Sequence, residues 1–456
     1  MKRFGASISL LALASFVIAQ DVPKDTKSTS EKEKNYIIGG QVTIIPQTLL
    51  PFHSPYSGPN SLIDPSTAAT DWTDTYTLFL GWRPTKGLEL YVDPEMARGT
   101  GIGGSVGLAG FPNGDVLRVP GFGIGALPQT PYLARYLAKW TVSTGKGTVK
   151  IPAGQNQVPG EAPTDRLVVS AGKMSVTDIF DTNTYSNNTR TQFMNWALIN
   201  SAAYDYAADT RGYSDGLAIE WIHPQWALRA GTFEMPVVPN GPVLATHWNQ
   251  DQGDQIEGDF YPQLAKGKDP ATVRLLGYRN IAHMGNYSQA IQIAQQTGMP
   301  PNITATETDG AIKYGFVLNM EQALGDDGET GLFARLGWDD GATESFAYTE
   351  CDDQASLGAQ ISGKRWKSPQ DRIGIALLSD GLSAAHRDYL ALGGDGFLLG
   401  DGKLNYGREM IMETYWQRQI SKRIWFTADY QLIANPGYNQ DRGPVSIITA
   451  RLHYEF

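Results

Sequence analysis

The sequence has a single cysteine, Cys351, so its 456 residues cannot form an internal disulfide. It also has no excess of basic residues, since the formal net charge is −10, and this argues against a nucleic-acid partner. Beyond residue 20 there is no run of the roughly 18 to 20 apolar residues that a transmembrane helix needs. The chain is therefore expected to be stable without disulfides and to cross no membrane as a helix.

Sequence patterns of catalysis and cofactor binding are also scarce. The six histidines show no metal-ligand spacing, and neither HExxH nor GxSxG occurs. Gly99, Gly101 and Gly104 have the spacing of a dinucleotide-binding loop, but no βαβ unit follows them. We therefore interpret residues 98–130 as a flexible loop, and we predict no cofactor, no metal and no enzymatic activity.

The N-terminus predicts export. Lys2 and Arg3 precede an apolar stretch that ends in small residues at Ala19, which is the pattern of a cleavable signal. The apolar stretch is too short to span a bilayer. We predict a signal peptide over residues 1–19. Residues 20–34 are rich in charged and hydroxyl side chains, which predicts a mobile periplasmic tail.

Residues 35–456 contain repeated segments in which apolar and polar side chains alternate. The clearest is the last: from Ile448 to Phe456, even positions are apolar or aromatic and odd positions are polar or charged. A strand has a period of two residues, so one face would meet lipid and the other a wet lumen. A final strand that ends on an aromatic residue, here Phe456, is also the feature that outer-membrane assembly machinery recognises.

The lengths of the connections favour a closed barrel. From Leu217 onward, short and long connections alternate, as in barrels with brief periplasmic turns and long outer loops. If residues 88–97 and 166–176 run in the same direction, a further strand must lie between Arg98 and Asp165, and we place it near residues 146–152. We predict an all-β fold, a transmembrane antiparallel β-barrel of about 16 strands, over residues 35–456, with short helices in the outer loops.

The polar rows of these strands supply the candidate binding residues. Arg, Asp, Glu and Tyr are suited to hydroxyl-rich solutes, because charged groups bond to hydroxyls and aromatic rings stack on apolar faces. A transport site must also bind weakly enough to release its solute. The candidates on the predicted lumen face are Glu89, Tyr91, Asp93, Glu95, Arg229, Lys313, Arg335, Glu413, Asp429 and Arg451.

Two long loops are candidates for a constriction. We predict a long loop over residues 177–213, with a helix over residues 191–207. Loops of this length are usually functional, so this stretch, or the region 98–139, is expected to fold toward the channel. An outer lid that packs on the barrel rim is the alternative.

The chain resembles the carbohydrate-selective porin family of the OprB type, over nearly all of the predicted mature chain. The resemblance lies in these segments: 172–181, 190–196, 207–213, 336–341, 400–406, 435–439 and 442–445. It implies a sixteen-stranded barrel in the outer membrane of a Gram-negative bacterium, passive uptake of small glucose-like sugars, and no cofactor. Some relatives carry an additional N-terminal cell-wall-binding domain, for which the short tail here leaves no room.

Other functions remain open at this stage. The barrel could be a general or export pore for another solute, and it could be a monomer or a trimer. A secreted soluble glycan-binding protein or glycosidase is the alternative from another class. Its carboxylates would include Glu89, Asp93 and Glu95, but these share one face of one strand, which is the geometry of a lumen lining. The partners we expect are small sugars, outer-membrane lipid and the assembly machinery.

Overall fold

The computed structural model describes residues 34–116, 127–264, 269–346 and 349–456. The predicted signal peptide and nearly all of the predicted tail lie outside these residues. Among the described residues, no helix is both long and apolar enough to cross a membrane.

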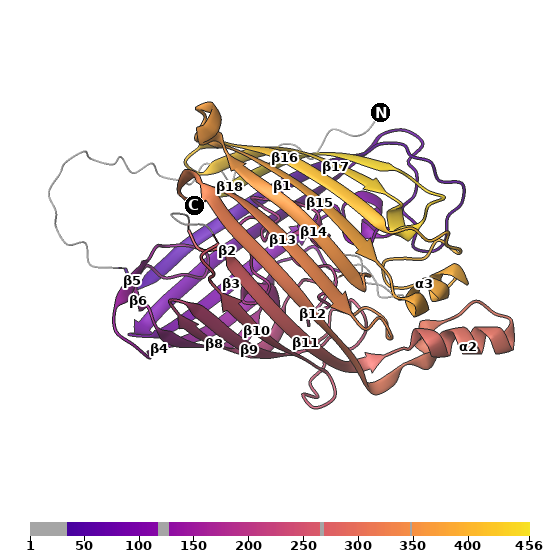
Figure 1. Ribbon diagram of the computed structural model, residues 1–456, viewed down its shortest axis with the longest axis horizontal. Coiled ribbons are helices and arrows are strands. Elements are labelled where there is room, and N and C mark those ends of the chain that lie inside the picture. Colours follow the sequence, from indigo (N-terminus) through magenta and orange to yellow (C-terminus); the bar gives the residue numbers. More distant parts are fainter. Residues whose placement is uncertain (1–33, 117–126, 265–268, 347–348) are drawn as a thin grey trace. The chain divides into compact units, whose positions relative to one another are not determined.

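Sixteen antiparallel strands close into one barrel (Figure 1). The strands are β1 (Tyr36–Leu49), β2 (Ala69–Thr85), β3 (Leu88–Arg98), β4 (Tyr132–Ser143), β7 (Arg166–Met174), β8 (Ser214–His223), β9 (Trp226–Glu234), β10 (Gln252–Phe260), β11 (Thr272–Met284), β12 (Thr308–Gly325), β13 (Thr330–Asp339), β14 (Asp353–Ser362), β15 (Asp371–Gly381), β16 (Glu409–Ser421), β17 (Ile424–Ala434) and β18 (Val445–Glu455). The predicted fold class is confirmed.

The other elements are short and lie in the connections. They are the hairpin of β5 (Thr148–Ile151) and β6 (Gly160–Pro163), the helices α1 (Trp196–Ile199), α2 (Tyr287–Thr297) and α3 (Ala384–Ala391), and the 3-10 helices η2 (Ile102–Ser105), η3 (Val176–Asp178), η4 (Ile303–Thr306), η5 (Asp326–Gly328), η6 (Gly363–Trp366) and η7 (Pro436–Tyr438).

The first and last strands close the ring. In the register of β1 with β18, Ile44 lies opposite Leu452. The pairing continues to the chain end, where the backbone groups of Gly40 and Phe456 exchange two hydrogen bonds, of 3.0 and 3.2 Å. Closure leaves no unpaired sheet edge, which is the condition for strands to cross a bilayer.

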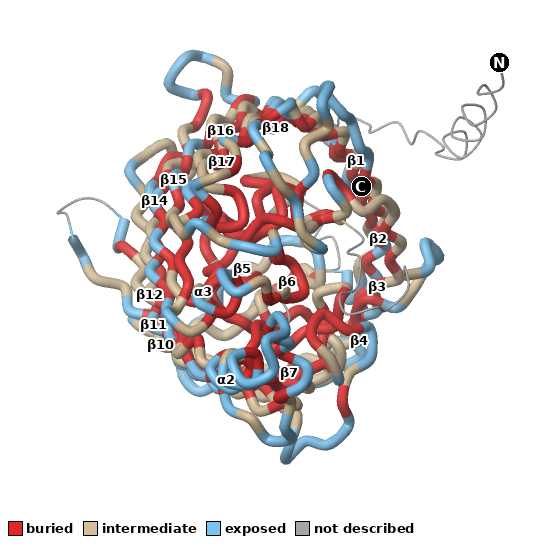
Figure 2. The backbone as a smooth tube through the Cα atoms, turned by 90° about the vertical axis from the view of Figure 1, so that its right-hand side faces the viewer, coloured by how far each residue is buried: buried red, intermediate tan, exposed pale blue. Residues whose placement is uncertain are grey.

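The two faces of the barrel differ as the alternation predicted. On β13, Leu336 is 50% exposed whereas its neighbour Arg335 is fully buried. The outward row is a belt of apolar side chains: Leu78, Leu80, Leu90, Leu228, Leu275, Phe316, Leu357, Leu377, Ile448 and Leu452. A surface of this kind is suited to lipid. Inside the ring, Figure 2 shows chain segments that are largely buried.

The barrel has a loop end and a turn end. At the turn end the links are short: two residues, Lys86 and Gly87, join β2 to β3, and residues 422–423 join β16 to β17. At the loop end the links are long, for example residues 382–408 between β15 and β16. The longest link at the turn end is residues 144–165, which contains the β5–β6 hairpin.

The predicted position of the concealed strand is wrong. The strand exists, but it is β4, over Tyr132–Ser143. Residues 146–152 contribute β5, which pairs only with β6 and stays outside the barrel sheet. The sequence did not indicate β4 because a bulge interrupts the alternation of this strand. The bulge lies where the pairing of β4 with β3 shifts, between Asp93 and Pro94 of β3.

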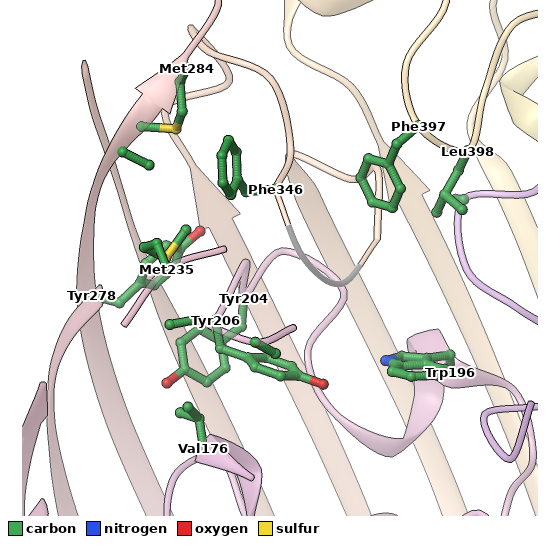
Figure 3. Close-up of a cluster of buried hydrophobic side chains, with 14 of the residues drawn as sticks. Val176, Trp196, Tyr204, Tyr206, Met235, Tyr278, Met284, Phe346, Phe397 and Leu398 are labelled. Atoms are coloured by element: carbon green, nitrogen blue, oxygen red, sulfur yellow. The ribbon is translucent and has the colours of Figure 1, made fainter. Parts of the chain in front are cut away.

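Aromatic side chains pack together inside the loop end (Figure 3). Tyr204 and Tyr206 pack at a centroid distance of 5.5 Å, and Tyr204 lies 5.2 Å from Tyr278 of the barrel wall. Phe346 and Phe397, from two further loops, belong to the same buried cluster. Residues 99–116 are mostly buried as well, so this part of the predicted flexible loop is packed, while residues 117–126 lie outside the described chain.

Buried carboxylates tie the outer loops to one another. Glu350 accepts hydrogen bonds from the backbone N–H groups of Leu398 and Leu399, at 2.8 and 2.7 Å. Glu344 accepts one from the N–H of Gly285, at 2.6 Å. Burial raises the pKa of Glu350 to about 7 and that of Glu344 to about 8, from the ordinary 4.5. Both residues lie in residues 340–352, between β13 and β14.

These pKa values predict that the outer loops open more easily as the pH rises. Between pH 4.5 and pH 8 the closed loops bind more protons than opened loops do, so their stability is complete below pH 4.5 and falls through the folded pKa values. The protection factors of residues 382–408 against hydrogen exchange, which remove the intrinsic pH dependence of exchange, are expected to be higher at pH 5 than at pH 8. In Glu344→Gln/Glu350→Gln this pH difference should shrink, and in the exposed control Asp388→Asn it should persist. Equal protection factors at the two pH values in the unaltered protein contradict this prediction.

The apolar belt predicts that a charged side chain placed on it lowers the free energy of unfolding in lipid. Leu357 is 59% exposed at the middle of β14. Leu357→Arg is expected to lower the free energy of unfolding in lipid vesicles by about 2–4 kcal/mol, because the guanidinium would lie in hydrocarbon. Urea titration followed by tryptophan fluorescence measures this, with Leu357→Phe as the control. Equal stabilities of the two variants would show that this face does not contact lipid.

Candidate functional site

A single loop, residues 175–213, folds into the barrel and fills much of its interior; we name it the inner loop. Arg335 of β13 holds it from the wall. Its guanidinium donates to Asp181 Oδ1 at 3.1 Å and to the backbone carbonyls of Leu198 and Ser186 at 2.9 and 2.8 Å. Arg335 and Asp181 are both fully buried. A buried pair with its hydrogen bonds satisfied fixes the position of the loop.

A second set of contacts holds the inner loop to β16 and β18. Glu413 of β16 accepts from the backbone N–H groups of Met194 and Asn195, at 2.5 and 2.9 Å. Arg451 of β18 donates to the carbonyl oxygens of Thr189 and Gln192, at 2.5 and 2.9 Å. Inward-facing charges of the wall thus pair with the backbone of the loop.

Glycines of the wall make room for the inner loop. A Cβ atom at Gly337 would lie 2.2 Å from Ser201 Oγ, and one at Gly331 would lie 2.1 Å from the Tyr185 ring. Both glycines are on β13, beside Arg335. Side chains at these two positions would push the loop away from the wall.

The predicted helix over residues 191–207 is largely absent. Only α1, residues 196–199, is helical there, capped by the side chain of Asn195, which accepts from the N–H of Ala197. The loop is nevertheless ordered, because its backbone groups bond to wall side chains in place of helical partners. The prediction that it folds toward the channel is confirmed.

A second loop segment, residues 99–116, packs beside the inner loop; we name it the companion loop. The carbonyl of Pro112 accepts from the amides of Gln47 and Gln431, at 3.1 and 2.7 Å. Asn113 donates to Thr73 of β2 at 2.9 Å. Part of the region 98–139 therefore also lies inside the barrel, as the sequence suggested.

A cavity of about 490 Å³ remains between the two loops and the wall formed by β1 to β4. Its lining is mostly polar and carries both signs of charge, together with several aromatic rings. Among the lining residues are Glu95, Asp115, Tyr132, Arg135, Asp178, Arg190, Trp196, Tyr206, Arg211 and Tyr213.

Arg190 of the inner loop links the loops to the wall across this cavity. Its guanidinium lies 3.0 Å from Asp115 of the companion loop and 3.1 Å from Glu95 of β3. Glu95 also accepts from the hydroxyls of Tyr132 and Tyr213, at 2.6 and 2.9 Å. One arginine, two carboxylates and two tyrosines thus form a connected network, the Arg190 network, at the cavity wall.

A second arginine extends the charged lining. Arg135 of β4 donates to both carboxylate oxygens of Asp178, at 2.8 and 2.9 Å, and lies 3.6 Å from Asp93. Its guanidinium also lies 5.0 Å from the centre of the Tyr213 ring. The Arg211 guanidinium likewise lies 3.8 Å from the centre of the Tyr132 ring. Each tyrosine therefore has a cation on its ring and a carboxylate at its hydroxyl.

The ten predicted site residues occupy three kinds of environment. Glu95 lines the cavity. Arg335, Glu413 and Arg451 hold the inner loop, and Lys313 lies 3.4 Å from Asp205 of that loop. The remaining members pair within the wall or with the β5–β6 hairpin: Glu89, Tyr91, Asp93, Arg229 and Asp429. Direct contact of any of them with a solute stays a prediction.

Sequence reasoning missed the residues that the loops contribute. Arg190, Arg211 and Tyr213 lie in segments that carry the family resemblance, which is the signal that could have singled them out. Arg135 was missed because β4 was placed elsewhere, and with it the inward row of that strand. Asp115 gives no signal in the sequence.

The comparisons with known proteins agree with this architecture. The family model described as "Carbohydrate-selective porin, OprB family" matches residues 80–456. The chain belongs to the OprB family. A solved structure, the high-pH form of Pseudomonas putida OprB, is 16% identical with a TM-score of 0.67, and the match covers 92% of this chain and 94% of that chain. This likeness shows the same fold.

Two less similar structures also match. OmpT of Vibrio cholerae with loop L8 deleted is 9% identical with a TM-score of 0.47, and the match covers 93% of this chain and 100% of that one. The outer-membrane channel DcaP of Acinetobacter baumannii is 10% identical with a TM-score of 0.46, and the match covers 92% and 97%. No curated protein matches the chain.

This OprB-family porin is a sugar-selective channel in the outer membrane of a Gram-negative bacterium. The predicted family, function and location are thereby confirmed. The loop end of the barrel is the extracellular end and the turn end is the periplasmic end, because barrels of this kind place their short turns in the periplasm. The cavity between the loops lies inside this barrel.

The contacts of Arg335 predict that its loss releases the inner loop. Arg335→Met leaves Asp181 buried without its cation, and breaking such a pair costs about 3–5 kcal/mol. We expect faster proteolysis within residues 175–213 and a higher single-channel conductance, with the barrel still folded. Arg418→Met, at the exposed turn end, is the control and should behave like the unaltered protein. Unchanged proteolysis and conductance in Arg335→Met contradict the anchoring role.

Proposed function

We propose that sugars pass through the 490 Å³ cavity and that the Arg190 network recognises their hydroxyl groups there. The observation that carries this proposal is the juxtaposition, across one cavity, of Arg190 with Glu95 and Asp115. Carboxylates accept hydrogen bonds from the vicinal hydroxyls of a sugar. A guanidinium donates hydrogen bonds, in a planar fork, to the oxygens of those hydroxyls.

The aromatic lining supports the same substrate class. Tyr132, Trp196, Tyr206 and Tyr213 line the cavity, and the apolar face of a sugar ring stacks on such side chains. The cavity volume also falls within the roughly 300–1,000 Å³ of small-molecule sites, which is sufficient for a small sugar. Mixed charges with no dominant sign favour neutral polar solutes over ions of one sign.

The same contacts favour passage over catalysis. The family and the fold are those of a channel. A glycosidase needs one carboxylic acid that holds a proton and one free carboxylate. Here Glu95 and Asp115 both pair with the same guanidinium, that of Arg190, so neither carboxylate is free. We infer that these carboxylates bind solute and perform no hydrolysis.

The outer surface supports two partners. The apolar belt and the outward tryptophans at strand ends, such as Trp82 and Trp221, are suited to lipid and to its boundary with water. At the chain end, Phe456 is 48% exposed beside Tyr454. We infer that membrane lipid covers the belt and that the assembly machinery recognises the final strand.

The Arg190 network predicts the effect of removing its guanidinium. A hydrogen bond to a charged group contributes about 1.5–3 kcal/mol, so Arg190→Gln is expected to weaken sugar binding roughly tenfold or more. Arg190→Lys keeps the charge without the fork and should give an intermediate value. Sugar-induced current noise in planar bilayers measures the binding constant, and Arg387→Gln on α3 is the surface control.

A comparison of solutes tests the selectivity. Liposomes that contain the unaltered porin should swell faster in a small sugar than in an amino acid of equal size, and Arg190→Gln should reduce this preference. Equal swelling rates for the two solutes would indicate a general pore. A sugar binding constant unchanged by Arg190→Gln would remove the network from the recognition site.

A further inference from the structure

The link between β4 and β7 is much longer than the periplasmic turns require. Residues 144–165 make this connection, whereas Lys86 and Gly87 alone join β2 to β3. Within it, β5 and β6 pair from Thr148 opposite Pro163 to Ile151 opposite Gly160. A long link inside a compact barrel is usually functional.

The tip of this hairpin, residues 152–159, docks inside the periplasmic mouth. Figure 1 places the hairpin at the end of the barrel opposite α2 and α3, and Figure 2 draws it within the ring of strands. Arg83 of β2 donates to the carbonyls of Val158 and Pro159, at 2.8 and 2.9 Å. The same guanidinium pairs with Glu89 at 2.6 Å, which fixes its orientation.

Two further contacts join the tip to the inward row of β3. The N–H of Val158 donates to the hydroxyl of Tyr91 at 3.1 Å, and Asn156 donates to Asp93 Oδ2 at 2.8 Å. Val158 is fully buried. Two of the predicted lumen residues, Tyr91 and Asp93, therefore hold the hairpin directly, and a third, Glu89, acts through Arg83.

The docked tip also reaches the solute cavity. Gln155, next to Asn156, is one of the cavity-lining residues. Asp93, which accepts from Asn156, lies 3.6 Å from Arg135, and Arg135 pairs with Asp178 of the inner loop at 2.8 Å. The hairpin and the inner loop thus meet at one charged network, from opposite ends of the channel.

We propose that the tip of the β5–β6 hairpin is a second constriction of the channel, which sets the size of solute that passes from the cavity to the periplasm. Its docking is polar: three backbone groups and one amide bond to wall side chains, and the stem residues Thr148, Val149 and Lys150 are exposed. The proposal depends on the solute path through the cavity, which Arg190→Gln tests separately.

Cysteine labelling tests whether the tip lines the path. Cys351, the one native thiol, is 2% exposed, so we expect polar reagents to leave it unmodified. We expect that a charged methanethiosulfonate added to Gln155→Cys channels lowers the single-channel conductance in a step. The same reagent should leave the conductance of Lys150→Cys, on the exposed stem, unchanged. Complete labelling of Gln155→Cys, verified by mass spectrometry, with unchanged conductance overturns the proposal.

A negative charge added at the docking contact tests whether the tip sets the size limit. Asn156 has a positive φ of 49°, which aspartate also tolerates, so Asn156→Asp keeps the turn but places a carboxylate against Asp93. We expect this variant to conduct more and to admit larger polyethylene glycols. Gln157→Glu is the control, because it adds the same charge at the next residue, where the native side-chain amide donates to the Pro152 carbonyl. This variant should keep the native limit on polymer size.

The outcomes separate this proposal from the recognition site. Arg190→Gln should lower sugar affinity with the polymer limit unchanged, and Asn156→Asp should raise the polymer limit with sugar affinity unchanged. An Asn156→Asp channel with the native polymer limit and native conductance overturns the hairpin constriction, whatever the result at Arg190.

Discussion

Backbone groups that cross a bilayer find no water to bond with, and this constraint governs the whole structure. It requires a closed ring, which the pairing of β1 with β18 completes up to Phe456. It also divides every strand into a lipid row and a lumen row, because successive side chains point to opposite faces. Leu336 and Arg335, adjacent in sequence, therefore lie on the apolar outer face and in a polar interior.

The side chains of the lumen row also hold the long loops inside the barrel. Charged side chains inside the ring are costly unless paired, and the long loops supply partners that the wall lacks. Arg335, Glu413 and Arg451 bond to the backbone of residues 175–213, and this loop consequently needs little helix of its own. Among the described residues, this packing leaves a polar cavity of about 490 Å³, whose shape follows from how the loops are held.

The channel is accordingly built from its connections more than from its strands. The inner loop contributes Arg190, Arg211 and Tyr213 to the cavity, the companion loop contributes Asp115, and the hairpin tip contributes Gln155. In the proposed function this mixed-charge, aromatic lining recognises sugars, while the barrel wall fixes where each connection enters. Asp93 and Arg135 connect the extracellular and periplasmic contributions within one network.

The sequence alone determined the alternation of faces, the closed antiparallel barrel, the count of about 16 strands and the family, because period-two patterning and short motifs are local properties of the chain. It located ten inward residues but could not tell a wall anchor such as Arg335 from a cavity residue such as Glu95. That distinction depends on which loop group lies opposite each side chain. Only the tertiary structure decided it, together with the position of β4 and the docking of residues 152–159, because these depend on contacts between segments far apart in sequence.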